Sequence, residues 1–140
     1  RATGVVLSGN GNPVSNCYMH DFASLDDSGH YDGVEMNGLN NNCAIGNNTI
    51  INQKDQTSCV QMNNFSGASD SLIVSSNYLS GGAYPVYSDA NQGAGAMTNI
   101  SILNNIFAHG VFGWIAINSN TPTHTGNRDI TTGFVVDSII

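Results

Sequence analysis

The chain has 140 residues, which is enough for one domain with a sizeable core. Charged residues make up only 9% of it, while 20 Asn, 15 Ser, 9 Thr and 16 Gly predict little helix, because all four residue types have low helix propensity. Ten acidic residues against three basic ones give a net charge of −7, which argues against nucleic acid and anionic membrane surfaces as partners. The longest apolar run, residues 111–117, is too short to span a bilayer.

Short segments in which apolar residues alternate with polar ones recur along the chain, separated by turns rich in Gly, Asn and Ser. In chain order they cover residues 4–7, 14–19, 33–36, 43–50, 59–62, 72–79, 85–88, 100–107 and 114–117. The segments that begin at residues 4, 33, 59, 85 and 114 are spaced by 29, 26, 26 and 29 residues. Alternation with a period of two predicts β-strands, and a repeat of this length predicts a solenoid.

Two strands per repeat and the absence of helical periodicity exclude ankyrin, tetratricopeptide and leucine-rich arrays. The sequence predicts an all-β fold, a right-handed parallel β-helix of four to five coils. We expect one domain over residues 1–140, either a whole protein or a piece of a longer chain.

In such a fold, equivalent residues of successive coils stack about 4.8 Å apart. Asn48, Asn77 and Asn105 are spaced by 29 and 28 residues and should form a ladder of hydrogen-bonded amides, with Cys17 in the equivalent upstream place. Three apolar columns should fill the interior. They are Val34, Val60, Val86 and Ile115, with Met36, Met62 and Ile117 beside them; Cys43, Leu72 and Ile100; and Ile45, Val74 and Ile102.

The three cysteines, Cys17, Cys43 and Cys59, fit no C-x-x-C spacing. Buried thiols are favoured over one disulfide with a thiol left over. Sequons at Asn47, Asn64 and Asn99 and the excess of Asn over Lys favour an extracellular location, including the surface of a virion or a cell appendage.

Several runs resemble secreted right-handed β-helix repeat proteins of the pectate-lyase-like fold. They are His30-Tyr-Asp-Gly-Val-Glu-Met36, Asn77-Tyr-Leu-Ser-Gly-Gly82, Tyr84-Pro-Val-Tyr87 and Phe112-Gly-Trp114. The resemblance covers most of the chain, and it implies the coil architecture and a polysaccharide ligand more than any one chemistry.

Two enzyme classes of this fold can be compared with the chain. Lyases need strong bases, of which only Arg1, Lys54 and Arg128 are present, and an acidic protein repels a polyuronate. Hydrolases carry an Asn-Thr-Asp-Gly element that Tyr31-Asp32-Gly33 partly matches, but the Arg-Ile-Lys signature is missing. No catalytic signature is complete, so enzymatic activity stays open.

Half of the acidic residues fall within one short stretch of the chain, together with two histidines. They are Asp21, Asp26, Asp27, Asp32 and Glu35, with His20 and His30. Carboxylates beside a histidine are typical of general acid/base catalysis, for which Asp32, Glu35 and His30 are the candidates. Asp26 and Asp27 could contribute to a calcium site, and no other cofactor is indicated. The alternative is that Asp26-Asp27 and Asp32-Gly33 are ordinary turn residues.

Strand alternation predicts that Glu35 points outward, in line with Gln61 and Tyr87 on successive coils, with Tyr84 just before the same strand. Such a row suits a sugar chain, because aromatic rings pack on C–H surfaces while amides and carboxylates bind hydroxyls. Trp114 is either a further sugar platform or a coil cap.

We therefore expect an extracellular module that binds, or binds and cleaves, a neutral or weakly charged glycan. The alternative is a structural shaft or tail-spike-like fibre without catalysis. The apolar stretch 133–140 predicts that one end of the solenoid is covered, by the chain itself or by a second copy.

Overall fold

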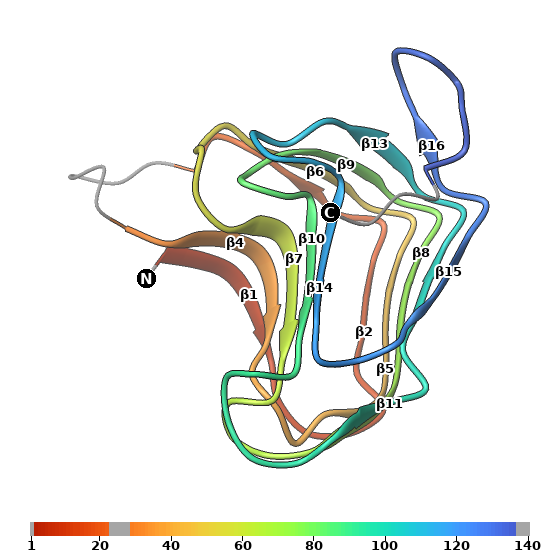
Figure 1. Ribbon diagram of the computed structural model, residues 1–140. Coiled ribbons are helices and arrows are strands. Elements are labelled where there is room, and N and C mark those ends of the chain that lie inside the picture. The colour runs from red at the N-terminus through yellow and green to blue at the C-terminus, as the bar shows by residue number, and fades with distance from the viewer. Residues whose placement is uncertain (1, 23–28, 137–140) are drawn as a thin grey trace.

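The computed structural model describes residues 2–22 and 29–136. Within these ranges the chain forms a parallel β-solenoid of about four turns, whose walls are three stacked sheets (Figure 1). This arrangement confirms the predicted fold class. The described ranges contain no helix, and so none that is long and apolar enough to cross a membrane.

Each sheet stacks strands from successive coils in parallel, and in sheet B one coil contributes two short strands, β11 and β12, which both pair with β8. Sheet A contains β1 (Ala2–Leu7), β4 (Tyr31–Met36), β7 (Ser58–Asn63), β10 (Val86–Asp89) and β14 (Ile115–Asn118). Sheet B contains β2 (Pro13–Ser15), β5 (Asn41–Gly46), β8 (Ser69–Ser75), β11 (Met97–Thr98), β12 (Ser101–Leu103) and β15 (Thr123–Thr125). Sheet C contains β3 (Tyr18–Met19), β6 (Thr49–Asn52), β9 (Tyr78–Gly81), β13 (Ile106–Ala108) and β16 (Arg128–Asp129).

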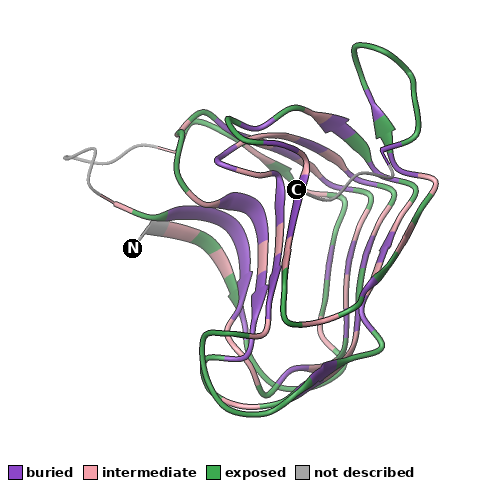
Figure 2. Cartoon of the chain, in the orientation of Figure 1, coloured by how far each residue is buried: buried purple, intermediate pink, exposed green. Residues whose placement is uncertain are grey.

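The core lies inside the three walls, where buried side chains line the tube along its length (Figure 2). The strand registers confirm the predicted columns: Val34 pairs with Val60, Val60 with Val86, and Val86 with Ile115. Likewise, Cys43 pairs with Leu72, and Ile45 pairs with Val74. Stacked columns therefore hold the coils together, since each apolar side chain is covered by its equivalents above and below.

The asparagine ladder runs along the corner between sheets B and C. Asn48 donates from its side-chain nitrogen to Oδ1 of Asn77 at 3.0 Å, and Asn77 donates in the same way to Asn105 at 3.0 Å. The ladder has a further rung that the spacing did not predict, since Asn105 donates to Asn127 at 2.9 Å. At its other end Cys17 contributes only its backbone N–H, which donates to Oδ1 of Asn48.

A left-handed residue precedes every ladder position: Asn16, Asn47, Ser76, Asn104 and Gly126 all have positive φ. This conformation suits Asn and Gly and reverses the chain sharply. The ladder asparagine can therefore turn inward between two strands at each coil.

All three cysteines are free thiols, and Cys43 and Cys59 are buried, as expected. Burial raises the pKa of Cys59 to about 12, so this thiol is protonated and unreactive.

The chain after β16 folds back onto its own last coil. Val135 pairs antiparallel with Arg128, and Val136 donates its N–H to Asn127 and joins the core cluster. Phe134, in contrast, is 75% exposed. Part of the predicted apolar tail thus covers the end of the core within the same chain.

Candidate functional site

In sheet A, the regular alternation of inward and outward side chains is interrupted, and this interruption decides which residues lie on the outer face. Cys59 and Val60 are consecutive, yet both lie in the core cluster, and both of their N–H groups donate to the carbonyl of Pro85 at 3.0 Å. Gly33 is aligned with Cys59 and also faces inward, because a Cβ built on it would lie 2.5 Å from Cγ2 of Ile50. In a regular strand, residues three apart point to opposite faces. Because two consecutive residues point inward here, residues 32 and 35 share the outer face, and so do residues 58 and 61.

Two carboxylates meet on this face. Asp32 accepts hydrogen bonds from the backbone N–H and the hydroxyl of Ser58 at 3.1 and 2.7 Å. The Gln61 amide, oriented with its nitrogen toward Asp32, donates to both carboxylate oxygens at 3.2 Å. Thr3 donates its hydroxyl to Oε2 of Glu35 at 3.1 Å. The following coil therefore holds Asp32, and the preceding coil holds Glu35.

The exposure expected for Glu35 is wrong. Its register with Gln61 is confirmed, and Gln61 is in turn in register with Tyr87. Glu35 accepts a hydrogen bond from Thr3, but the residue is only 2% exposed. Alternation predicts the side of the sheet to which a residue points, and it carries no information on what covers that side.

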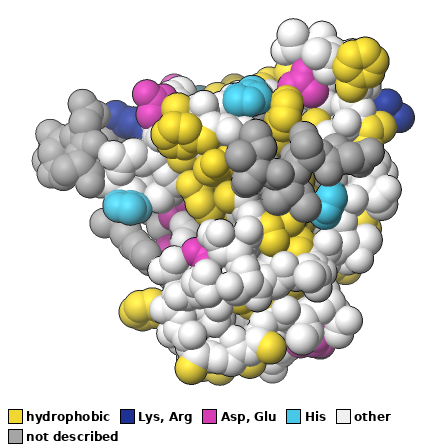
Figure 3. Space-filling view, viewed as in Figure 1, with side chains coloured by type: hydrophobic (Ala, Val, Ile, Leu, Met, Phe, Trp, Pro, Cys, Tyr) yellow, Lys and Arg dark blue, Asp and Glu magenta, His cyan; other side chains and the backbone are white. Residues whose placement is uncertain are grey.

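Aromatic rings continue the same face toward the C-terminal coils. The rings of Tyr84 and Tyr87 pack edge to face with centroids 5.3 Å apart, and Phe112 lies 6.0 Å from Tyr84. Backbone bonds from Val111 and Phe112 to Gly82 and Ala83 place Phe112 there. Figure 3 shows acidic atoms in a hollow beside a group of hydrophobic side chains on this side of the molecule. We name Asp32, Glu35, Gln61, Tyr84, Tyr87 and Phe112 the sheet A face.

Burial controls the electrostatics of this face. It raises the pKa of Asp32 above its usual range; the hydrogen bond from Ser58 opposes the increase, and the charge of Glu35 adds to it. Burial also raises the pKa of Tyr87, with smaller contributions from Tyr84 and Asp32. The tyrosine is therefore a neutral phenol that can donate a hydrogen bond to a ligand.

The raised pKa of Asp32 predicts a change of stability with pH. Above its ordinary pKa of 3.8, Asp32 keeps its proton in the folded protein and loses it on unfolding, so the free energy of unfolding falls as the pH rises through the raised value. Denaturant unfolding of the wild type and Asp32→Asn should show the variant gaining relative stability as the pH rises above 3.8, the ordinary pKa of the carboxyl, until Asp32 of the folded protein has also lost its proton. The opposite trend would mean that the folded protein favours the charged carboxylate.

Of the remaining candidate catalytic and metal residues, only His30 lies within the described part of the chain. His30 is exposed just before β4 and makes no hydrogen bond to Asp32 or Glu35 in the described part of the chain. Asp26 and Asp27 lie outside the described residues. Among residues 2–22 and 29–136, no group of three or more His, Cys, Asp or Glu side chains could hold a metal ion, so the calcium site stays a prediction.

Trp114 contacts the end of the solenoid, as a coil cap would, and its role as a sugar platform stays a prediction. It packs half-buried against the core, its indole N–H donates to Asp129 at 2.9 Å, and its ring lies edge-on to His109. Asp129 in turn accepts the N–H groups of Thr131 and Thr132. Trp114 therefore fastens the last loop onto the solenoid.

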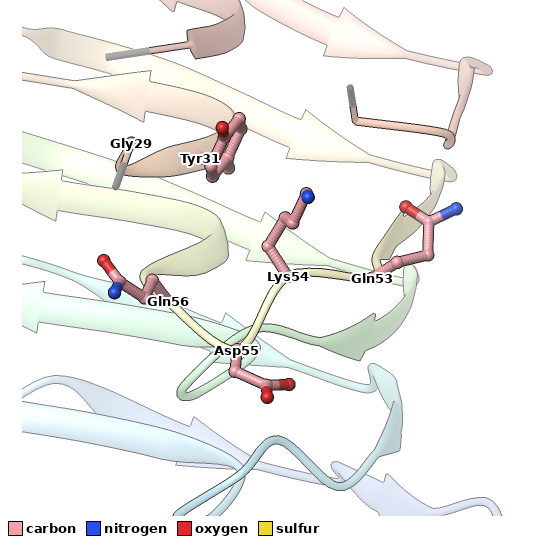
Figure 4. Close-up of a pocket in the computed structure, with 6 residues that line it drawn as sticks. All are labelled: Gly29, Tyr31, Gln53, Lys54, Asp55 and Gln56. Carbon is pink, nitrogen blue, oxygen red and sulfur yellow. The ribbon is translucent and has the colours of Figure 1, made fainter. Parts of the chain in front are cut away.

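Lys54 lies at a pocket beside the turn before β7. The pocket has a volume of about 400 Å³ and is lined by Tyr31 and the side chains of residues 53–56. Figure 4 shows Lys54 and Tyr31 pointing toward one another, with the ammonium 5.5 Å from the ring centroid, while Asp55 points away. This cation–π contact joins the loop before β7 to Tyr31 at the start of β4.

Comparison of the chain with protein-family models, curated proteins and solved structures gave no match. The structure therefore establishes the parallel β-helix fold. The resemblance to pectate-lyase-like proteins remains an expectation from sequence motifs.

Proposed function

We propose that this chain is a carbohydrate-binding β-helix module that takes a neutral or weakly charged glycan across the sheet A face. The observation that carries the proposal is that Tyr87, whose ring packs on Tyr84, is in register with Gln61, the residue whose amide contacts Asp32. Sugar rings offer C–H surfaces that pack on aromatic side chains and hydroxyls that bond to amides. A glycan lying along the solenoid axis would meet these groups in succession.

The net charge of −7 supports a ligand of low charge, since a polyanion would be repelled. The proposal is for binding without cleavage. Asp32 already accepts bonds from Ser58 and Gln61, and Glu35 is almost fully buried, so neither carboxylate is placed to transfer a proton to a bound sugar. An extracellular location fits this ligand, and exposed sequon residues at Asn47 and Asn99 are consistent with it.

The test is a glycan array probed with the wild type and matched variants. Tyr87→Ala and Gln61→Ala should weaken binding to the best glycan by about tenfold each, because each removes one direct contact. Phe65→Ala removes a ring that is 67% exposed and lies outside the face, and it should bind like the wild type. An array without signal, or equal binding by all variants, would contradict the proposal.

A structural shaft is the second candidate function. It is favoured by β1, which forms an edge of sheet A and carries Val6 at 55% exposure. Edge strands offer unpaired backbone groups to another chain. Light scattering over a range of concentrations distinguishes the two functions: growing assemblies favour the shaft, and a constant monomer mass counts against it.

A further inference from the structure

The corner between sheets B and C holds a second groove, whose lining shares no residue with the sheet A face. Its volume is about 470 Å³, and its floor is the asparagine ladder at Asn48 and Asn77. The ladder amides bond to one another and to backbone carbonyls, as Asn77 does to Ile45, so they are not available to a ligand.

The rim of this groove is lined by equivalent residues of successive coils. On one side stand the left-handed residues Asn47, Ser76 and Asn104, all exposed to solvent. On the other side stand Thr49, Tyr78 and Ile106, which are in register across β6, β9 and β13. Amides and hydroxyls thus face an aromatic and aliphatic row along the solenoid axis.

The aromatic row extends one coil upstream. Tyr18 is in register with Thr49 and is 64% exposed, so two tyrosines, Tyr18 and Tyr78, stand on either side of Thr49. With coils about 4.8 Å apart, the two tyrosine positions are separated by about 10 Å. An extended polysaccharide presents the same face of its chain at intervals of comparable length.

No Asp, Glu, Lys, Arg or His is among the residues that line the groove, and one coil upstream the ring of Tyr18 stacks on His20 with centroids 4.3 Å apart, so one ring face of Tyr18 is left for a sugar. We propose that this corner groove is a second carbohydrate site, which takes an extended uncharged polysaccharide with its sugar faces on Tyr18 and Tyr78 and its hydroxyls on Asn47, Ser76 and Asn104. The site is independent of the sheet A face, because the two share no residue.

Affinity electrophoresis tests the site with hydroxyethyl cellulose, galactomannan and arabinoxylan as neutral probes and polygalacturonate as the anionic control. In a Tyr87→Ala background, which disables the sheet A face, retention by a neutral probe should persist. Adding Tyr18→Ala and Tyr78→Ala should weaken it by about tenfold, while Tyr78→Phe should preserve it, because the ring face remains. Phe65→Ala is the matched control, and an unchanged melting temperature confirms folding.

The outcomes separate the two sites. If Tyr87→Ala alone removes all retention, the corner groove is overturned and the sheet A face stands. If only the Tyr18 and Tyr78 changes remove it, the corner groove stands and the sheet A face falls. Absence of retention by the wild type on every neutral probe, or a wild-type dimer that Tyr78→Ala converts to a monomer, overturns the corner groove.

Discussion

The Asn77→Ala variant should lose about 3–5 kcal/mol of its free energy of unfolding. Asn77 occupies a central rung and makes four side-chain hydrogen bonds: it accepts from the backbone and side chain of Asn48, and it donates to Ile45 and Asn105. All these groups are buried, so truncation leaves donors and acceptors in the interior without partners or water. Each unsatisfied buried group costs about 1–3 kcal/mol.

Denaturant unfolding followed by circular dichroism measures this loss, with Asn91→Ala as the control. Asn91 is exposed, so its truncation should change stability by less than about 0.5 kcal/mol. If Asn77→Ala unfolded at the same denaturant concentration as the control, the ladder would contribute nothing to the fold.

Gly33→Ala should lower the free energy of unfolding by about 1–3 kcal/mol through overpacking. The added Cβ would lie 2.5 Å from Cγ2 of Ile50 and 2.6 Å from the carbonyl oxygen of Cys59, so either β6 or β7 must move. The same movement would displace Asp32 from Ser58 and Gln61. Glycan binding at the sheet A face should therefore weaken together with stability.

Gly46→Ala is the matched control for this substitution. A Cβ at Gly46 would meet Ser75 at an ordinary distance of 3.4 Å, and the residue does not have positive φ. It should stabilise the protein slightly, by up to about 1 kcal/mol, because alanine restricts the unfolded chain. Thermal melts compare the melting temperatures of Gly33→Ala and Gly46→Ala. Equal melting temperatures would show that position 33 has room for a side chain.

Features that repeat with the coil could be predicted from the sequence. The apolar columns and the rungs at Asn48, Asn77 and Asn105 recur every 26 to 29 residues, and the registers confirm them. A parallel solenoid converts constant spacing directly into spatial stacking, so these contacts needed no tertiary information.

Features that break the repeat could not be predicted. Asn127 lies 22 residues after Asn105, because the last coil is shorter, and the spacing rule therefore missed this rung. The two consecutive inward residues at Cys59 and Val60 depend on a shared carbonyl that no pattern of hydrophobicity reveals. The burial of Glu35 and the role of Trp114 as a fastening for the last loop likewise depend on neighbouring coils.

Chemical-shift mapping of the isotope-labelled wild type, titrated with the glycan that gives the strongest array signal, tests the proposed binding on the sheet A face most directly. The account predicts that the backbone and side-chain amide signals of Gln61, Tyr84, Tyr87 and Phe112 shift progressively with glycan concentration. The amide signal of Phe65, which lies outside the face, should not shift. Saturable shifts that leave these four residues unmoved would contradict the assignment of the sheet A face as a glycan site.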